Sequence, residues 1–86
     1  MPDAIGRRIK RLREQRGLTL RALAAQAKVA VSSIAAVEVG TRSGDRLSAQ
    51  TCRRLARALG VTVDYLIGVY EDEDDEAPAG RALAVG

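Results

Sequence analysis

The chain has 86 residues, with 14 Lys and Arg, 11 Asp and Glu, one Cys and no His. This length allows one small domain with a single hydrophobic core and leaves little room for a catalytic cavity. One cysteine excludes an internal disulfide, and without histidine the His/Cys ligand sets of metal sites are missing, so we expect no metal and no cofactor. No segment approaches the about 20 apolar residues of a membrane span, and the first residues, MPDAIGRRIK, contain no apolar signal region. We therefore expect a soluble, cytoplasmic protein without membrane contact or a small-molecule ligand.

The charges are distributed unevenly along the chain. Residues 1–70 hold 13 basic and 5 acidic residues, a net charge of +8, whereas residues 71–86 hold six acids and one Arg, a net charge of −5. A basic body attracts polyanions such as nucleic acids, although an ordinary solvated surface is an alternative explanation. The six consecutive acids at 71–76 repel one another. We expect a folded domain over residues 1–70 and a disordered acidic tail over residues 71–86.

The first predicted helix is amphipathic. Ile5, Ile9 and Leu12 recur at helical spacing and predict its buried stripe, and Gly17 is placed to end it. Basic residues fill the positions between the apolar ones, and we expect them on an outer face. These basic residues are Arg7, Arg8, Lys10, Arg11 and Arg13.

Residues 18–40 predict two short helices joined by a tight turn at residues 28–30. Thr19 is placed to cap the first helix, and Gly40 is placed to end the second, which covers about residues 31–38. The apolar residues at helical spacing, expected in the core, are Leu23, Ala24, Ala27, Ile34 and Val37. This arrangement is typical of a helix-turn-helix, whose second helix lies in the major groove of DNA.

Two further helices follow a polar loop at residues 41–46. Ser48 is a plausible cap for the fourth helix, and Thr62 or Val63 begins a short fifth helix. Glycines at residues 60 and 68 are placed to end them. The apolar residues of these helices are Cys52, Leu55, Ala56, Leu59, Leu66 and Ile67. With almost no strand signal in the sequence, the predicted fold class is all-α.

Four blocks of sequence resemble a known family. They are IGRRIKRLREQRGLT, LAAQAKV, SSIAAVEVG and RRLARALGVTVDYLIG. Together they resemble the Cro/C1-type helix-turn-helix regulators, the XRE family, over about residues 5–68. The resemblance implies a five-helix bundle of the lambda-repressor-like DNA-binding type. It also implies a sequence-specific regulator of transcription, a repressor, that binds double-stranded DNA with residues 19–38.

The resemblance implies one structural ion pair. Family members carry an Arg late in the first helix that reaches a Glu late in the third, and the matching residues are Arg13 and Glu38. Glu38 follows Val37 in an otherwise apolar stretch, which is unusual for a solvated acid. The alternative is an exposed Glu near a helix end.

The chain departs from the family at positions that face DNA. Leu20 stands where the family often has Gln, and Lys28 replaces a Gly in the turn. The expected groove-facing residues of the third helix, including Ala35, are short, and only its two serines can hydrogen-bond a base or a phosphate. We therefore expect loop arginines, DNA shape and the amides that begin the second helix to contribute to binding. The residues expected on DNA are Leu20, Arg21, Val31, Ser32, Ser33, Ala36, Arg42 and Arg46.

The sequence bears on three classes of function. An enzyme is not expected, because the chain has no nucleophile–base spacing and no phosphate-binding Gly loop. The preferred function is a DNA-binding regulator that acts as a homodimer, because one module buries little interface and such modules pair on two half-sites. We expect the dimer contact on the fourth and fifth helices, with Tyr65, Leu66 and Tyr70. The alternative for Tyr65 is an aromatic side chain in the core or at its rim. The alternative is a protein-binding adaptor that uses the apolar positions Val31, Ala35, Ala36 and Val39.

Overall fold

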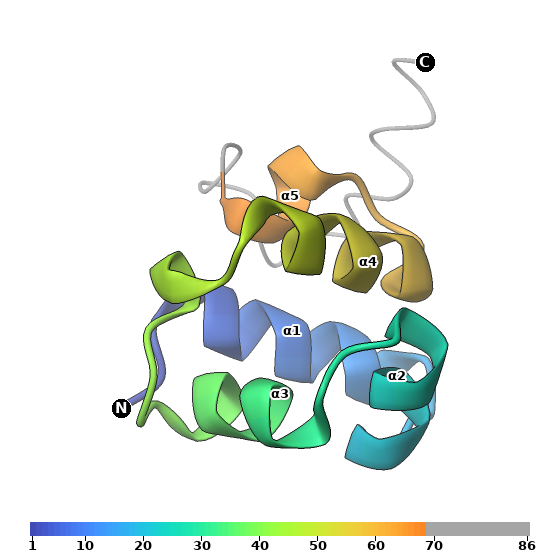
Figure 1. Ribbon diagram of the computed structural model, residues 1–86, viewed down its shortest axis with the longest axis horizontal. Coiled ribbons are helices and arrows are strands. Elements are labelled where there is room, and N and C mark those ends of the chain that lie inside the picture. The colour runs from blue at the N-terminus through green and yellow to red at the C-terminus, as the bar shows by residue number, and fades with distance from the viewer. Residues whose placement is uncertain (69–86) are drawn as a thin grey trace.

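The computed structural model describes residues 1–68, so Tyr70 and the predicted acidic tail at 71–86 lie outside the described residues. The described part contains five α-helices, one short 3-10 helix and no strand (Figure 1). The predicted all-α, five-helix fold is confirmed. The elements are α1 (Ala4–Gln15), α2 (Leu20–Ala27), α3 (Val31–Val39), η1 (Gly44–Arg46), α4 (Ala49–Leu59) and α5 (Val63–Ile67). None of these helices has the length and apolar character that a membrane crossing requires.

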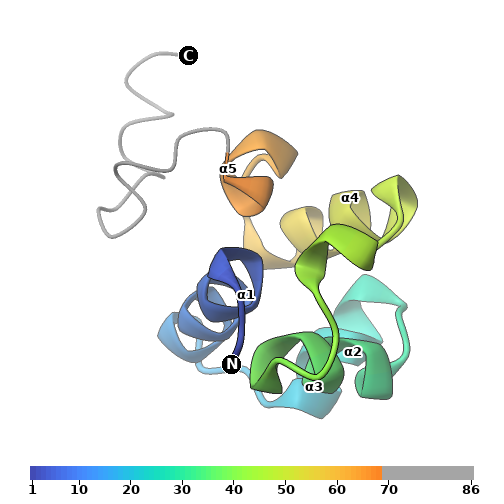
Figure 2. The same cartoon turned by 90° about the vertical axis from the view of Figure 1, so that its left-hand side faces the viewer.

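Helix α1 runs through the middle of the fold. In Figure 1, α4 and α5 lie above it, α3 lies below it, and α2 lies at its right-hand end. Figure 2 shows α1 almost end-on, with α3 beside it and α5 above it. Each α-helix contributes at least one side chain that is at most 1% exposed, and together these fill the core. They include Ile9, Leu23, Ile34, Leu55 and Leu66.

The predicted helix boundaries follow from capping. Thr19, Ser48 and Thr62 each accept a hydrogen bond from the backbone N–H three residues later. These bonds satisfy donors that the first turn of a helix leaves open, so the caps predicted at Thr19 and Ser48 are confirmed. For the fifth helix, Thr62 is the cap and Val63 is the first helical residue. The helix ends at Gly40, Gly60 and Gly68 have left-handed backbone conformations, as expected for glycine caps.

The outer basic face predicted for α1 is wrong at Arg8. This side chain is only 2% exposed, because it lies beside Ile9 on the edge of the apolar stripe. Its Nη1 donates to the carbonyl of Leu66 at 3.1 Å, and its guanidinium lies 5.4 Å from the centre of the Tyr65 ring. A cation is favourable both at the C-terminal end of a helix and over an aromatic face. Arg8 therefore connects α1 to α5 and is not a phosphate contact.

Two other arginines of this segment also bind within the fold. The Nη2 of Arg11 donates to the hydroxyl of Tyr65 at 2.7 Å, and the Nε of Arg16 donates to the carbonyl of Leu59 at 2.6 Å. Within the predicted outer face, Arg7 and Lys10 are the exposed residues. Much of the positive charge of α1 is therefore used to join helices.

The same packing changes the expected dimer surface. Tyr65 is 4% exposed and Leu66 is fully buried, both within a single chain. These two side chains belong to the core because α5 must cover α1 and α4, and they are not free to contact a second copy. Ile67 is 40% exposed and remains on the surface of α5.

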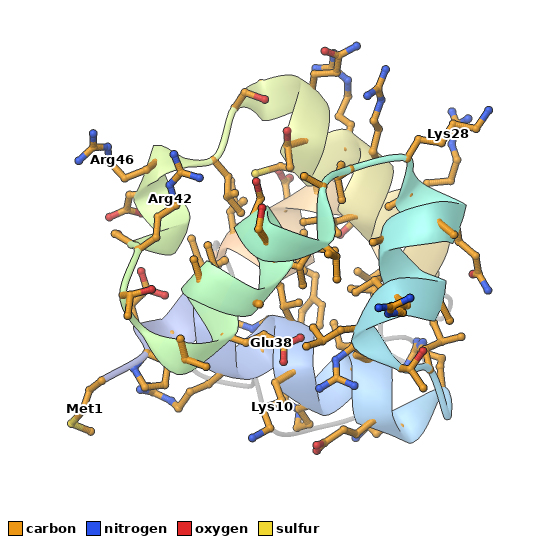
Figure 3. The ribbon with its side chains drawn as sticks, turned by 60° about the horizontal axis from the view of Figure 1, so that its bottom comes forward. Met1, Lys10, Lys28, Glu38, Arg42 and Arg46 are labelled. Carbon is orange, nitrogen blue, oxygen red and sulfur yellow. The ribbon has the colours of Figure 1, made fainter. Side chains whose placement is uncertain are left out.

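Helices α1 and α3 are held together by a close crossing and an ion pair. A Cβ on Gly6 would overlap the carbonyl of Val37, so only glycine allows this approach. Arg13 donates from Nε to Oε2 of Glu38 at 2.8 Å and from Nη2 to Oε1 at 3.0 Å. The Nη1 of Arg13 also donates to the carbonyl of Leu18 at 2.8 Å. Figure 3 shows Glu38 between α3 and α1.

The pair is largely removed from solvent. The side chains of Arg13 and Glu38 are 12% and 4% exposed. The hydrogen bonds to Glu38 raise the pKa of the Arg13 guanidinium. Two parallel bonds between a guanidinium and a carboxylate fix orientation as well as distance. The pair therefore sets the rotation of α3 about its axis, and with it the face that α3 turns outward.

Replacing Glu38 by Gln should destabilise the domain by about 3 kcal/mol, because a buried guanidinium loses its counter-charge. For a domain of this size that corresponds to a fall in Tm of roughly 12–24 °C. The matched control is Glu14→Gln, which changes an exposed acid of α1. Thermal melts of the two variants measure the difference, and an unchanged Tm for Glu38→Gln would contradict a stabilising pair.

Candidate nucleic-acid interface

The turn between α2 and α3 has an unusual backbone. Lys28 adopts φ 60°, and within residues 1–68 it is the one non-glycine residue with positive φ. This left-handed conformation costs an ordinary residue about 1 kcal/mol relative to glycine. The N–H of Val29 then donates to the carbonyl of Ala24 at 3.1 Å, which completes the tight turn. Figure 3 shows the Lys28 side chain pointing away from the body at the end of α2.

The N-terminus of α3 is open. Its N-cap residue, Ala30, makes no side-chain cap hydrogen bond, whereas the other four α-helices of the described segment all have such a cap. The first N–H groups of α3 are therefore not taken by a capping side chain, and they carry the positive end of the helix dipole. In α2, by contrast, Thr19 Oγ1 accepts from the N–H of Ala22 at 3.0 Å, which occupies one of the amides expected to hold a phosphate.

The outward face of α3 is small and partly apolar. Ser32 is exposed and Val31 is 41% exposed, whereas Ser33 and Ala36 are half-buried. Val39, at the C-terminal end, is 63% exposed. Of the candidate residues on α3, Val31 and Ser32 are therefore the most accessible, and both lie in its first turn.

The two candidates on α2 differ in exposure. Arg21 is exposed in the first turn, where its side chain is free to reach a phosphate. Leu20 is half-buried and packs against the core, so most of its surface is turned inward.

The segment after α3 carries Arg42 and Arg46, both exposed and close together in Figure 3. The carbonyl of Ala36 accepts from the N–H groups of Thr41 and Arg42, at 3.0 and 3.2 Å. The predicted loop at 41–46 also contains the 3-10 turn η1, in which Ser43 caps Asp45. Both arginines therefore project from a hydrogen-bonded segment.

A single carboxylate joins this segment to α1. Asp3 accepts at Oδ1 from the N–H of Gly6 at 2.9 Å, which caps α1. Its Oδ2 accepts from the N–H of Gly44 at 2.7 Å and from the hydroxyl of Ser43 at 3.0 Å. Partial burial acts to raise the pKa of Asp3, but the bonds from Gly6, Gly44 and Ser43 prevail, and the pKa lies below its ordinary value.

Sequence reasoning missed Asp3, although an Asp three residues before Gly6 at the start of a helix is a typical N-cap signal. The contact with Gly44 had no local signal, because the two residues lie 41 positions apart. Gly44 packs so closely on Ile5 that a Cβ would overlap that side chain.

Exposed residues thus lie at both ends of α3, and four of them are candidates from the sequence, whereas Lys28 is not. Lys28, Val31 and Ser32 lie at or before its N-terminal end, and Arg42 and Arg46 lie beyond its C-terminal end (Figure 3). An exposed helix with an open N-terminus and cations beyond both ends matches a recognition helix. A family model described as helix-turn-helix matches residues 9–66.

The chain belongs to the Cro/C1-type helix-turn-helix family, the XRE family. This XRE-family chain is also similar to a chain from a solved complex of the SinR and SinI proteins, with a TM-score of 0.72 and 28% sequence identity. The alignment covers 93% of this chain and 75% of the other. No curated protein matches. Family and fold together make the chain a DNA-binding transcriptional regulator.

Replacing Asp3 by Ala should cost about 1–2 kcal/mol near neutral pH, because both the cap of α1 and the bonds to Ser43 and Gly44 are lost. The lowered pKa means that ionised Asp3 stabilises the fold above its unfolded pKa of about 3.9, and that this contribution disappears as the pH falls through the lower folded value. Urea denaturation between pH 7 and pH 2 measures the difference in free energy of unfolding between wild type and Asp3→Ala. The difference in free energy of unfolding should decrease below about pH 4. Asp45→Ala, which changes an exposed acid, is the control. A difference that does not change with pH would contradict this role of Asp3.

Substitutions of Arg42 and Arg46 should affect DNA binding differently from a substitution of Ser32. Arg42→Ala and Arg46→Ala should each weaken binding to all duplexes alike, because a phosphate contact carries no sequence information. Ser32→Ala should instead reduce the preference between sequences. Binding to a randomised duplex pool, followed by sequencing of the bound fraction, separates the two effects. Normal binding by both arginine variants would show that this segment does not contact DNA.

Proposed function

We propose that the protein binds specific operators as a homodimer in the cytoplasm and represses transcription by occupying them. The observation that carries the proposal is the geometry of α3: its accessible first turn has an uncapped N-terminus, and exposed cations lie beyond each end. A helix N-terminus and flanking cations are the groups that bind DNA phosphates.

Sequence preference then comes from few groups. Ser32 and Ser33 supply hydrogen bonds, and Val31 and Ala36 supply apolar contact with thymine methyl groups. These short side chains give modest discrimination. Arg42 and Arg46 add affinity through phosphate contacts, which carry no sequence information.

Two copies strengthen this limited contact. One module buries too small an interface for tight specific binding, and a dimer reads two half-sites about 34 Å apart. With Tyr65 and Leu66 in the core, Ile67 is the exposed large apolar residue that α5 offers to a second copy.

A protein-binding adaptor is the second candidate. Val31 and Val39 are 41% and 63% exposed on the same short helix, and apolar exposure of this kind is typical of protein contacts. The solved structure similar to this chain is a complex of two proteins. In this alternative, α3 contacts a partner protein in place of DNA.

The dependence of affinity on salt separates the two candidates. If each module neutralises about 4–6 phosphates, the logarithm of the association constant K for DNA should decrease linearly with the logarithm of the salt concentration, with a slope near −4 to −5. Fluorescence anisotropy with labelled genomic duplexes between 50 and 300 mM salt measures it. A flat response, or no binding at the lowest salt, would favour the adaptor.

A further inference from the structure

A groove lies between the C-terminal end of α2 and the outer side of α4. Its volume is about 340 Å³. Four of its seven lining residues are basic, two are glutamines and one is apolar. They are Gln26, Ala27, Lys28, Gln50, Arg53, Arg54 and Arg57.

The charges in this groove are not compensated within the described part of the chain. Lys28 and the three arginines are exposed, and none forms an ion pair with an acid among residues 1–68. This contrasts with α1, where Arg8 and Arg13 are buried or paired. On α4, Gln50, Arg53, Arg54 and Arg57 follow a spacing of three and four residues, so they share one stripe. The groove therefore concentrates positive charge that no acid among residues 1–68 neutralises through an ion pair.

The two walls of the groove are joined at Lys28. The Nη1 of Arg54 donates to the carbonyl of Lys28 at 3.3 Å, and this bond links α4 to the turn. Lys28 itself holds the left-handed conformation that glycine would adopt without strain. A lysine here places a cation at the mouth of the groove at the expense of stability.

The groove is continuous with the DNA-binding face. Lys28 lies three residues before Val31, the first residue of α3. Figure 3 shows Lys28 at the opposite end of this face from Arg42 and Arg46. A duplex that receives α3 in its major groove passes the mouth of the α2–α4 groove at the N-terminal end of that helix.

We propose that this groove binds the sugar-phosphate backbone of the same duplex, outside the base pairs contacted by α3. The inference rests on the proposed DNA-binding function and extends the binding site along the duplex. Its lining favours DNA over a small anionic ligand. Small-molecule sites are mostly apolar with a few fixed polar groups, whereas this groove has one apolar residue and exposed cations.

The decisive variant is the double substitution Arg53→Ala/Arg57→Ala in the full chain. Both side chains are exposed on α4, so the Tm should stay unchanged. On a mixed-sequence 30-bp duplex the slope of log K against log salt should become shallower by about 2, because each phosphate contact contributes about 0.9. Affinity at 50 mM salt should fall about tenfold. Lys10→Ala, an exposed cation of α1, is the matched control and should leave both quantities unchanged.

Lys28→Gly tests the mouth of the groove without straining the turn. Glycine suits the left-handed backbone, so the Tm should equal or exceed that of wild type, while the salt slope becomes shallower by about 1. A loss of affinity without a loss of stability supports DNA contact and excludes a purely structural role for this lysine.

The outcomes separate this inference from the proposed function. If wild type binds no duplex even at low salt, the proposed function fails and the inference fails with it. If wild type binds but the double variant keeps its slope and affinity, the inference alone is overturned. A third outcome also overturns the inference. In it, inorganic tripolyphosphate binds wild type and not the double variant, while both proteins have the same salt slope on DNA. The groove would then be a site for a small oligophosphate and not for DNA.

Discussion

The position of α3 depends on one contact with α1. Gly6 lets the two backbones approach, and the Arg13–Glu38 pair then fixes their rotation. A recognition helix must present the same few side chains each time it meets DNA, and α3 has only short ones to present. A small error in its rotation would turn Ser32 away and leave no longer side chain to compensate. The structure therefore places a charged, directional interaction where apolar packing alone would permit slippage.

Arginine serves two separate purposes in this chain. Arg8 and Arg16 donate to carbonyls at the C-terminal ends of α5 and α4, where a cation complements the helix dipole. Arg42 and Arg46 are exposed beyond α3, and the groove arginines line one stripe of α4. The net charge of +8 over residues 1–70 consequently overstates the charge available to DNA. Charge counting from sequence treats all arginines alike, whereas burial decides which of them a polyanion can reach.

Local signals in the sequence were enough to predict the elements of the fold. Caps such as Thr19 and Ser48, and the apolar periodicity of each helix, depend on residues within a few positions of one another. The resemblance to the family supplied Arg13 and Glu38, which lie 25 residues apart and have no local signal. Contacts over such separations were otherwise missed, as with Asp3 and Gly44.

The groove between α2 and α4 was missed for the same reason. Lys28 departs from the family, and the arginines of α4 recur at helical spacing. Nothing in the sequence indicates that this stripe faces the end of α2, because that depends on how the helices pack. Arg8 shows a different error: the prediction placed it with the other basic residues on an outer face, whereas it is buried beside Ile9.

The first three residues pack against the end of α3 and the segment that follows it. A Cβ on Gly40 would overlap the backbone of Met1 and Pro2, the carbonyl of Pro2 accepts from Arg7, and Asp3 binds Ser43 and Gly44. A peptide fused before Met1 would thus emerge beside the end of α3. An affinity tag joined at this end would therefore compete with a duplex for the same space.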